Sequence, residues 1–166
     1  MNLRDERGFV HIYLMGLFSM VCVIILAMML ATFAGARKNA VAAYACFTDA
    51  ADFAAHTAVM NGVTAANYED APQVETYFTD SFSGITQTCF SGGEFVPGAG
   101  SPFLVPITFN ESGGFTPYNQ GDTLPDGSTA GADGFLINVT VPVFVGSFPF
   151  VGQQSINVPM SYYAEL

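Results

Sequence analysis

The stretch that decides the fold is FVHIYLMGLFSMVCVIILAMMLATFAGA, which occupies residues 9–36. It contains no Asp, Glu, Lys or Arg, and Arg37 and Lys38 follow it at once. As an α-helix it would be roughly 42 Å long, whereas the hydrocarbon layer of a bilayer is roughly 30 Å thick. The sequence therefore predicts a transmembrane helix over residues 9–36.

The charged residues are distributed very unevenly around this stretch. The chain has 166 residues and a net charge of −10, and its four basic residues (Arg4, Arg7, Arg37 and Lys38) all flank the apolar stretch. Twelve of its fourteen acidic residues follow Asn39. So acidic a segment would be repelled by the phosphates of nucleic acid, which argues against nucleic acid as a partner.

The orientation of the predicted helix depends on more than its flanking charges, because two basic residues lie on each side. The N-terminal amine adds a positive charge before the helix, and a long acidic segment can be exported regardless of loop charge. We predict a single-pass protein of the cell membrane with a cytoplasmic N-terminus and an extracytoplasmic C-terminal domain. The apolar run is about twice the 7–15 residues of a cleaved secretory signal, so we expect it to stay attached.

The helix is expected to continue past Lys38, because residues 39–60 are rich in Ala and lack Pro and Gly. A stripe on this continuation recurs at alternating steps of four and three: Ala40, Tyr44, Phe47, Ala51, Ala54 and Ala58. Asp49, Asp52 and His56 fall on the opposite side, which favours a solvated polar face over a metal site. Within the apolar stretch, small residues provide surfaces for helix packing: Gly16, Ala27, Ala31, Ala34 and Gly35.

The remainder of the chain indicates β-structure with long loops. The candidate strands are 85–90, 103–109, 135–144 and 155–163, and the last two alternate apolar and polar residues as in a hairpin. Pro142 and Pro159 predict that at least one of them is an edge strand or contains a bulge. The expected fold is α+β, with a long N-terminal helix packed on a small antiparallel β-sheet. Its segments are a charged leader (1–8), a transmembrane helix (9–36), its amphipathic continuation (37–61) and an exported β-rich domain (62–166).

Three features of the β-rich part and its helix leave alternatives open. Cys46 and Cys89 could form a disulfide in an oxidising compartment or remain two unpaired thiols. Asp122, Asp126 and Asp133 match part of a calcium-loop pattern, but Leu124 and Pro125 do not, so a solvated acidic loop is the default. An apolar loop around Phe148, Phe150 and Val151 either covers the end of the sheet or contacts a partner.

Nothing in the sequence indicates catalysis. It contains no Gly-rich phosphate loop, nucleophile elbow or zinc motif, and His56 is the only histidine after the apolar stretch. We therefore expect no catalytic residues, no cofactor and no resident metal.

The order of these features resembles the TadE/TadG-like pseudopilins of tight-adherence (Tad) pilus systems, which are similar to type IV pilins. Arg7-Gly8-Phe9 resembles a prepilin processing site, at which cleavage after Gly8 would leave Phe9 as the first residue. Where the family has Glu at the fifth mature position, this chain has Tyr13. The resemblance also covers the apolar helix, its Ala-rich continuation and two terminal strands.

This resemblance implies a structural, accessory subunit of a pilus assembly, with other pilin-like subunits or assembly proteins as partners. Two other functions remain open. One is the major subunit of a surface filament, and the other is a membrane-tethered extracellular binding domain that could depend on calcium.

Overall fold

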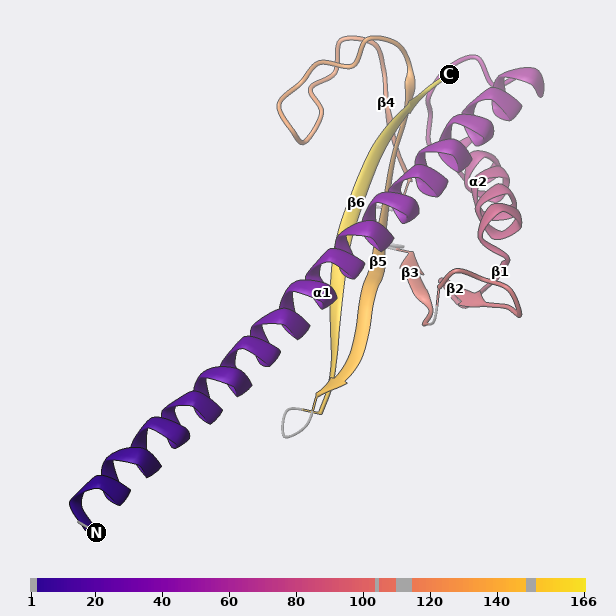
Figure 1. Cartoon of the computed structure of the whole chain (residues 1–166). Coiled ribbons are helices and arrows are strands. Elements are labelled where there is room, and N and C mark those ends of the chain that lie inside the picture. Colours follow the sequence, from indigo (N-terminus) through magenta and orange to yellow (C-terminus); the bar gives the residue numbers. More distant parts are fainter. Residues whose placement is uncertain (1–2, 104, 110–114, 149–151) are drawn as a thin grey trace. The chain divides into compact units, whose positions relative to one another are not determined.

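The computed structural model describes residues 3–103, 105–109, 115–148 and 152–166 (Figure 1). The chain divides into two compact units, Met1–Lys38 and Asn39–Leu166, and helix α1 (Leu3–Met60) runs through both. The second unit also contains α2 (Ala71–Thr86), β1 (Thr88–Ser91), β2 (Glu94–Pro97), β3 (Ile107–Phe109), β4 (Phe115–Tyr118), β5 (Gly134–Phe148) and β6 (Gly152–Glu165). The predicted α+β fold, a long helix packed on a small antiparallel sheet, is confirmed.

Helix α1 ends at Met60, and Asn61-Gly62 follow it. Gly62 has a φ of 95°, a left-handed conformation that a residue with a side chain adopts at a cost. Its N–H donates to the carbonyl of Val59, and the N–H of Val63 donates to the carbonyl of Ala58. These two bonds form a Schellman motif, which satisfies carbonyls at the helix end and turns the chain toward α2.

Helix α2 has 16 residues and includes part of the strand predicted over 85–90, which is a correction to the sequence prediction. It continues because Phe82 and Thr86 lie on the same buried face as Val74 and Phe78. It ends at Gln87, a left-handed residue with a φ of 53°. The first strand therefore begins only at Thr88.

The sheet is antiparallel and is built around β5. Strand order is β1-β2-β3-β5-β4, and β6 pairs with β5 along almost its whole length. Since β6 occupies one side of β5, β3 and β4 pair with different stretches of its other side, at Val139–Thr140 and Gly134–Ile137. The predicted terminal hairpin is thus confirmed and is longer than expected at both ends. Strands β2 and β4 were not predicted, and the strand predicted over 103–109 is only Ile107–Phe109.

Both prolines of the hairpin have the expected effect. The register of the β5–β6 ladder shifts between Pro142 and Phe144, which makes Val143 a bulge residue. Pro159 lies on β6, which pairs only with β5 among the described strands and is therefore an edge strand.

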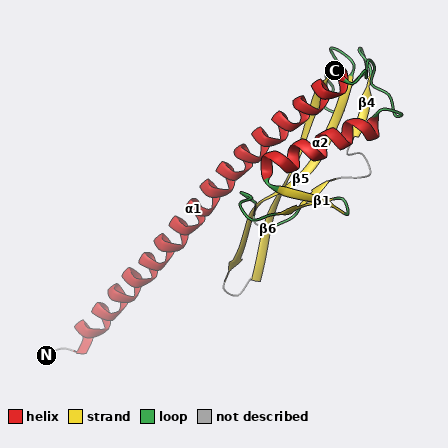
Figure 2. Cartoon of the chain, turned by 90° about the vertical axis from the view of Figure 1, so that its right-hand side faces the viewer, coloured by secondary structure: helices red, strands yellow, loops and turns green. Residues whose placement is uncertain are grey.

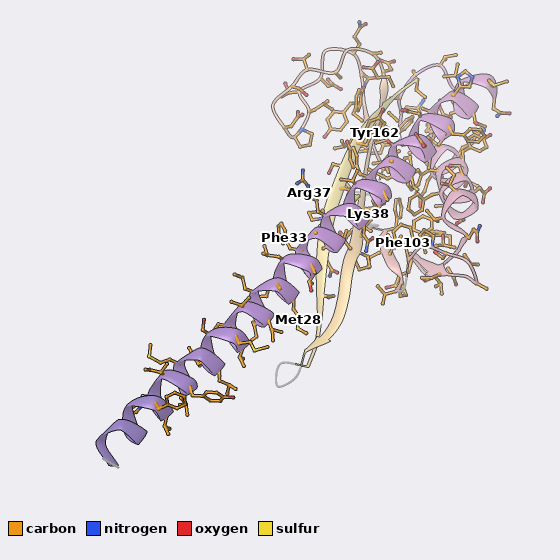
Figure 3. All side chains as sticks on the ribbon, in the orientation of Figure 1. Met28, Phe33, Arg37, Lys38, Phe103 and Tyr162 are labelled. Carbon is orange, nitrogen blue, oxygen red and sulfur yellow. The ribbon has the colours of Figure 1, made fainter. Side chains whose placement is uncertain are left out.

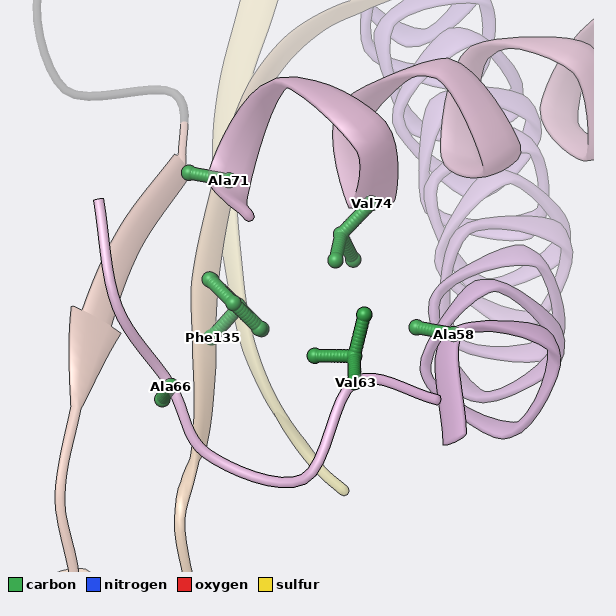
Figure 4. Close-up of a cluster of buried hydrophobic side chains, with 6 residues drawn as sticks. All are labelled: Ala58, Val63, Ala66, Ala71, Val74 and Phe135. Atoms are coloured by element: carbon green, nitrogen blue, oxygen red, sulfur yellow. The ribbon is translucent and has the colours of Figure 1, made fainter. Parts of the chain in front are cut away.

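The core lies between the sheet, α2 and the second half of α1 (Figure 2). Phe78 of α2 is fully buried, and its ring centre lies 5.8 Å from that of Phe47 on α1 and 6.1 Å from that of Phe109 on β3. A second cluster closes the end of α1 (Figure 4) and comprises Ala58, Val63, Ala66, Ala71, Val74 and Phe135. Helix, connection and sheet therefore share one apolar interior, which fixes residues 39–60 to the β-rich part.

Candidate functional site: the two halves of helix α1

The first half of α1 exposes apolar side chains on every side. All residues from Phe9 to Ala31 are exposed. Met28 and Phe33, both labelled in Figure 3, are 66% and 71% exposed. Such a surface is costly to keep in water. By length and composition, α1 could cross a membrane.

Two grooves lie near the beginning of this apolar half. One, of 320 Å³, is lined by Phe9, Ile12, Tyr13, Gly16, Leu17 and Met20. The other, of 520 Å³, is lined by His11, Leu14, Met15, Phe18, Ser19 and Cys22. At 3.6 residues per turn these two sets lie on opposite sides of the helix. Gly16 lines the first groove, and a Cβ at this position would meet no atom within 4 Å.

The residues predicted to pack against other helices have no packing partner in the described part of the chain. Ala27, Ala31, Ala34 and Gly35 are all exposed, and Gly16 and Gly35 have open space where a side chain would stand. They thus remain available for contacts outside this chain.

The predicted processing residues lie within the helix. Gly8 and Phe9 are both helical, and Phe9 is 72% exposed. Tyr13, at the position where the resembling family has Glu, is also 72% exposed. The structure thus places the first apolar residue and this tyrosine one turn apart on α1.

The second half of α1 is buried along one side, as predicted, but the buried surface is wider than the predicted stripe. Phe47, Ala51, Ala54 and Ala58 are fully buried, whereas Tyr44 is 44% exposed and Ala40 is half-buried. The helix also buries Ala43, Ala50 and Ala55. The reason is that α2 covers a second flank of the helix, where the Ser81 hydroxyl donates to the carbonyl of Ala50 at 3.2 Å.

Two hydrogen bonds attach the terminal hairpin to this half of α1. The Asn39 side-chain amide donates to the carbonyl of Val143, the bulge residue, at 3.1 Å. The Tyr162 hydroxyl donates to Oδ1 of Asp52 at 2.8 Å. Burial, together with this bond to a carboxylate, raises the pKa of Tyr162 to about 12. Sequence reasoning did not identify either bond, because each joins residues more than a hundred positions apart.

The second half also carries the predicted polar residues, of which Asp52 accepts the hydrogen bond from Tyr162 of the hairpin. Asp49, Asp52 and His56 are all exposed, and no group of three potential metal ligands occurs among the described residues. Arg37 and Lys38 are also exposed and have no hydrogen bond or ion pair with any described residue. The charges of the two signs therefore lie in separate bands along one helix.

Of the two alternatives for Cys46 and Cys89, the structure has the unpaired thiols and not the disulfide. Alternation along β1 gives the physical reason. Phe90 points into the aromatic core, where its ring centre is 4.8 Å from that of Phe95. Cys89 therefore points to the opposite face of the sheet and is exposed, whereas Cys46 lies half-buried on α1.

The acidic loop binds its own backbone. The backbone N–H of Asn119 donates to Asp122, that of Gln120 to Asp133, and that of Ser128 to Asp126. The Ser128 hydroxyl also donates to Asp126, and together these bonds lower the pKa of that carboxyl. The three carboxylates thus stabilise separate turns and do not form a calcium-binding group among the described residues.

The sheet carries a groove that the sequence did not reveal. The groove, of 410 Å³, is lined by Val105, Pro106, Thr108, Thr140, Pro142, Ser155 and Asn157. Extending the Thr108–Thr140 register places Pro106 opposite Pro142, where neither residue has an N–H to continue the ladder.

The structure does not test the prediction for the apolar loop. Phe148 ends β5, and Phe150 and Val151 lie outside the described residues.

Comparison of the chain with models of known protein families, with curated proteins and with solved structures gave no match.

Proposed function

We propose that this protein is a structural, non-catalytic subunit of a Tad or type IV-like pilus assembly, anchored in the membrane by the first half of α1. In this role it is a minor pilin or pseudopilin, with its N-terminus in the cytoplasm and its β-rich part outside. Its partners are other pilin-like subunits or assembly proteins, and it requires no cofactor.

The observation that carries the proposal is the division of one uninterrupted helix into two surfaces. From Phe9 to Ala31 the helix is exposed on all sides, whereas the second half is covered on one side by α2 and the sheet of its own chain. A helix that served only as an anchor would need about 20 residues. The 58 residues of α1 support a second role, as the spine on which an exported domain is built.

The surface of the first half supports contacts with more than one neighbour. Its two grooves lie on opposite sides of the helix, so that a second and a third helix could pack against it at the same time. The exposed Ala and Gly residues allow such helices to approach closely.

Mass spectrometry of the mature N-terminus tests the proposal most directly. Cleavage by a prepilin peptidase would give a chain that begins at Phe9, and Gly8→Val should leave Met1 or Asn2 as the first residue. Gly16→Val is the matched control, because it changes a glycine of the same helix outside the processing site. An intact N-terminus in both the native chain and the Gly16→Val control would contradict a processed pilin.

Electron microscopy and immunoblotting of surface material released by shearing test the assembly itself. A minor subunit should be present at a small fraction of the filament protein, and its deletion should reduce the number of filaments. A chain that is the bulk of the filament would instead be the major subunit. A chain that stays wholly in the membrane, with normal filaments after its deletion, would favour a tethered binding domain.

A further inference from the structure

The hairpin formed by β5 and β6 extends beyond the rest of its sheet (Figure 1). Strand β3 pairs with β5 only at Val139–Thr140, and β4 pairs with it at Gly134–Ile137. Beyond Thr140, no described strand other than β6 pairs with β5. We call residues 143–148 of β5 and residues 152–156 of β6 the hairpin arm.

Two contacts within the second unit identify the end at which the hairpin arm lies. Phe135 of β5 belongs to the same buried cluster as Ala58, and the carbonyl of Val143 accepts a hydrogen bond from Asn39. The strand from Phe135 to Val143 spans roughly 26 Å, and the helix from Ala58 back to Asn39 spans roughly 28 Å. Strand β5 therefore runs antiparallel to this part of α1. The arm continues for roughly 17 Å past Val143, beyond the first residue of the unit.

This end of the unit is where the chain leaves the membrane in the proposed function. Asn39 follows Ala36, the last residue of the apolar stretch, by three residues. Three residues span roughly 5 Å as a helix and at most roughly 11 Å when fully extended. Because Val143 is bonded to Asn39, the covalent chain keeps the beginning of the arm close to the membrane surface for every orientation of the second unit.

The hairpin is also the part of the unit that carries no charge. Residues 134–164 contain no Asp, Glu, Lys, Arg or His, whereas the rest of the unit contains twelve acidic residues. Edge strands of soluble proteins commonly carry charged side chains, which prevent them from pairing with other chains. A charge-free arm suits a membrane surface, because bringing charges toward lipid is costly. On the arm, Ile156 is 43% exposed and pairs across the hairpin with Phe144.

From these observations we infer that the hairpin arm rests in the headgroup layer of the membrane, beside the point at which α1 leaves it. The inference rests on the membrane anchor of the proposed function but not on a pilus. The open edges of the arm limit its depth, because unpaired backbone N–H and C=O groups do not occur in contact with the hydrocarbon region. Water and lipid headgroups satisfy these groups. The contact gives the second unit another attachment to the membrane and so restricts its rotation.

Quenching of a fluorescent label by lipid nitroxides tests the position and the depth of the arm. Ser155 on the arm and Ser161 farther along β6 are both exposed, lie on the same face of the strand and are roughly 20 Å apart. In a full chain whose native cysteines are replaced by Ala, Ser155→Cys or Ser161→Cys is labelled and reconstituted in phosphatidylcholine vesicles. A nitroxide on the headgroup should remove most of the fluorescence at position 155 and little at position 161.

A nitroxide deep in the acyl chains should leave both of these labels bright. A label on Cys22, kept as the only native cysteine in a third chain, should be quenched by the deep nitroxide. Headgroup quenching at position 155 should not depend on the amount of protein per vesicle. Equal quenching at 155 and 161, no quenching at 155, or quenching at 155 that requires a high protein density would overturn the inference.

An added charge tests why the arm lies there. In vesicles that contain anionic phosphatidylglycerol, Ile156→Asp should reduce headgroup quenching at position 155 about fivefold, because anionic lipid repels a negative charge near its surface. Ile156→Asn, which is similar in size but uncharged, should keep most of the quenching. Thermal unfolding of each full chain in detergent checks that its fold is kept. Quenching that is the same in Ile156→Asp and the native arm would overturn the inference.

Vesicle flotation separates failure of this inference from failure of the proposed function. If the chain does not float with the vesicles, or the label on Cys22 is not quenched by the deep nitroxide, the membrane anchor fails and the arm contact fails with it. If the chain floats and Cys22 is quenched but the label at position 155 is not, the anchor remains and only the arm contact fails.

Discussion

The two halves of α1 belong to one continuous helix but use opposite kinds of side chain. Residues 9–36 are mostly Leu, Met, Ile, Val and Phe, and those up to Ala31 are exposed on every side. Residues 39–60 are rich in Ala, with nine of 22, and their buried side contains a single large residue, Phe47. This difference indicates that the size of the side chains on each half of α1 depends on what that half packs against. Large apolar residues suit a fluid lipid environment, whereas alanines allow a sheet and a second helix to approach the backbone closely.

Charges in the middle of the first half should have the largest effect. Ile24→Asp combined with Ile25→Asp should oppose membrane insertion by about 5–7 kcal/mol, because each Asp near the centre of a spanning helix costs about 2.5–3.5 kcal/mol. The chain should be released from membranes by alkaline extraction, while the near-UV circular dichroism of its β-rich part is unchanged. Ile24→Leu with Ile25→Leu is the control. Retention of the charged variant in membranes would refute a spanning role.

Removal of the single large buried residue should have the next largest effect. Phe47→Ala should destabilise the folded unit by about 3–5 kcal/mol, because the ring is fully buried against Phe78 and Tyr162. Phe53→Ala is a matched control on the same helix, since Phe53 is 60% exposed and its loss should change stability by less than about 0.5 kcal/mol. Chemical denaturation in detergent measures both. Equal losses for the two variants would contradict the division between buried and outward sides.

Enlarging a buried alanine should cost somewhat less. Ala54→Leu should lower stability by about 1–3 kcal/mol, because the added atoms must displace the sheet or α2. Ala45→Leu adds the same atoms on the outward side and should be close to neutral in the isolated chain. If thermal unfolding shows Ala54→Leu to be as stable as Ala45→Leu, close approach is not the reason for the alanines.

Sequence reasoning succeeded where a pattern is long and local. The apolar stretch, the Ala-rich continuation and the terminal hairpin each span many residues. It was less successful where the answer depends on tertiary neighbours. Tyr44 was assigned to the buried stripe because a single period was assumed, yet α2 shifts and widens the buried side. Strands β2 and β4 have four residues each, too few for alternation to be recognised.

The candidate site was predictable to the same extent. The residues of the first half could be named from composition, because the proposed role requires only that they are apolar or small. The cysteine pair failed because the direction of Cys89 depends on the register of β1, which is set by Phe90 entering the core. The bonds of Asn39 and Tyr162 could not be anticipated, since each depends on the bulge and pairing of strands far along the chain.

Loss of the hydrogen bond between Tyr162 of the hairpin and Asp52 of α1 should have the smallest effect on stability, and this effect depends on pH. The pKa of Tyr162 is about 12 in the folded protein and about 10 in an unfolded chain, so the folded state favours the protonated hydroxyl. Its stabilising contribution should be complete below pH 10 and should be lost as the pH rises from 10 to 12, because the unfolded state releases its proton first. Thermal unfolding at pH 9, 10, 11 and 12 measures this loss. In Tyr162→Phe the decline over that range should be shallower, although Tyr163, whose pKa is also raised by burial, still contributes. Identical declines in the native chain and in Tyr162→Phe would mean that the bond to Asp52 does not help to hold the hairpin on α1.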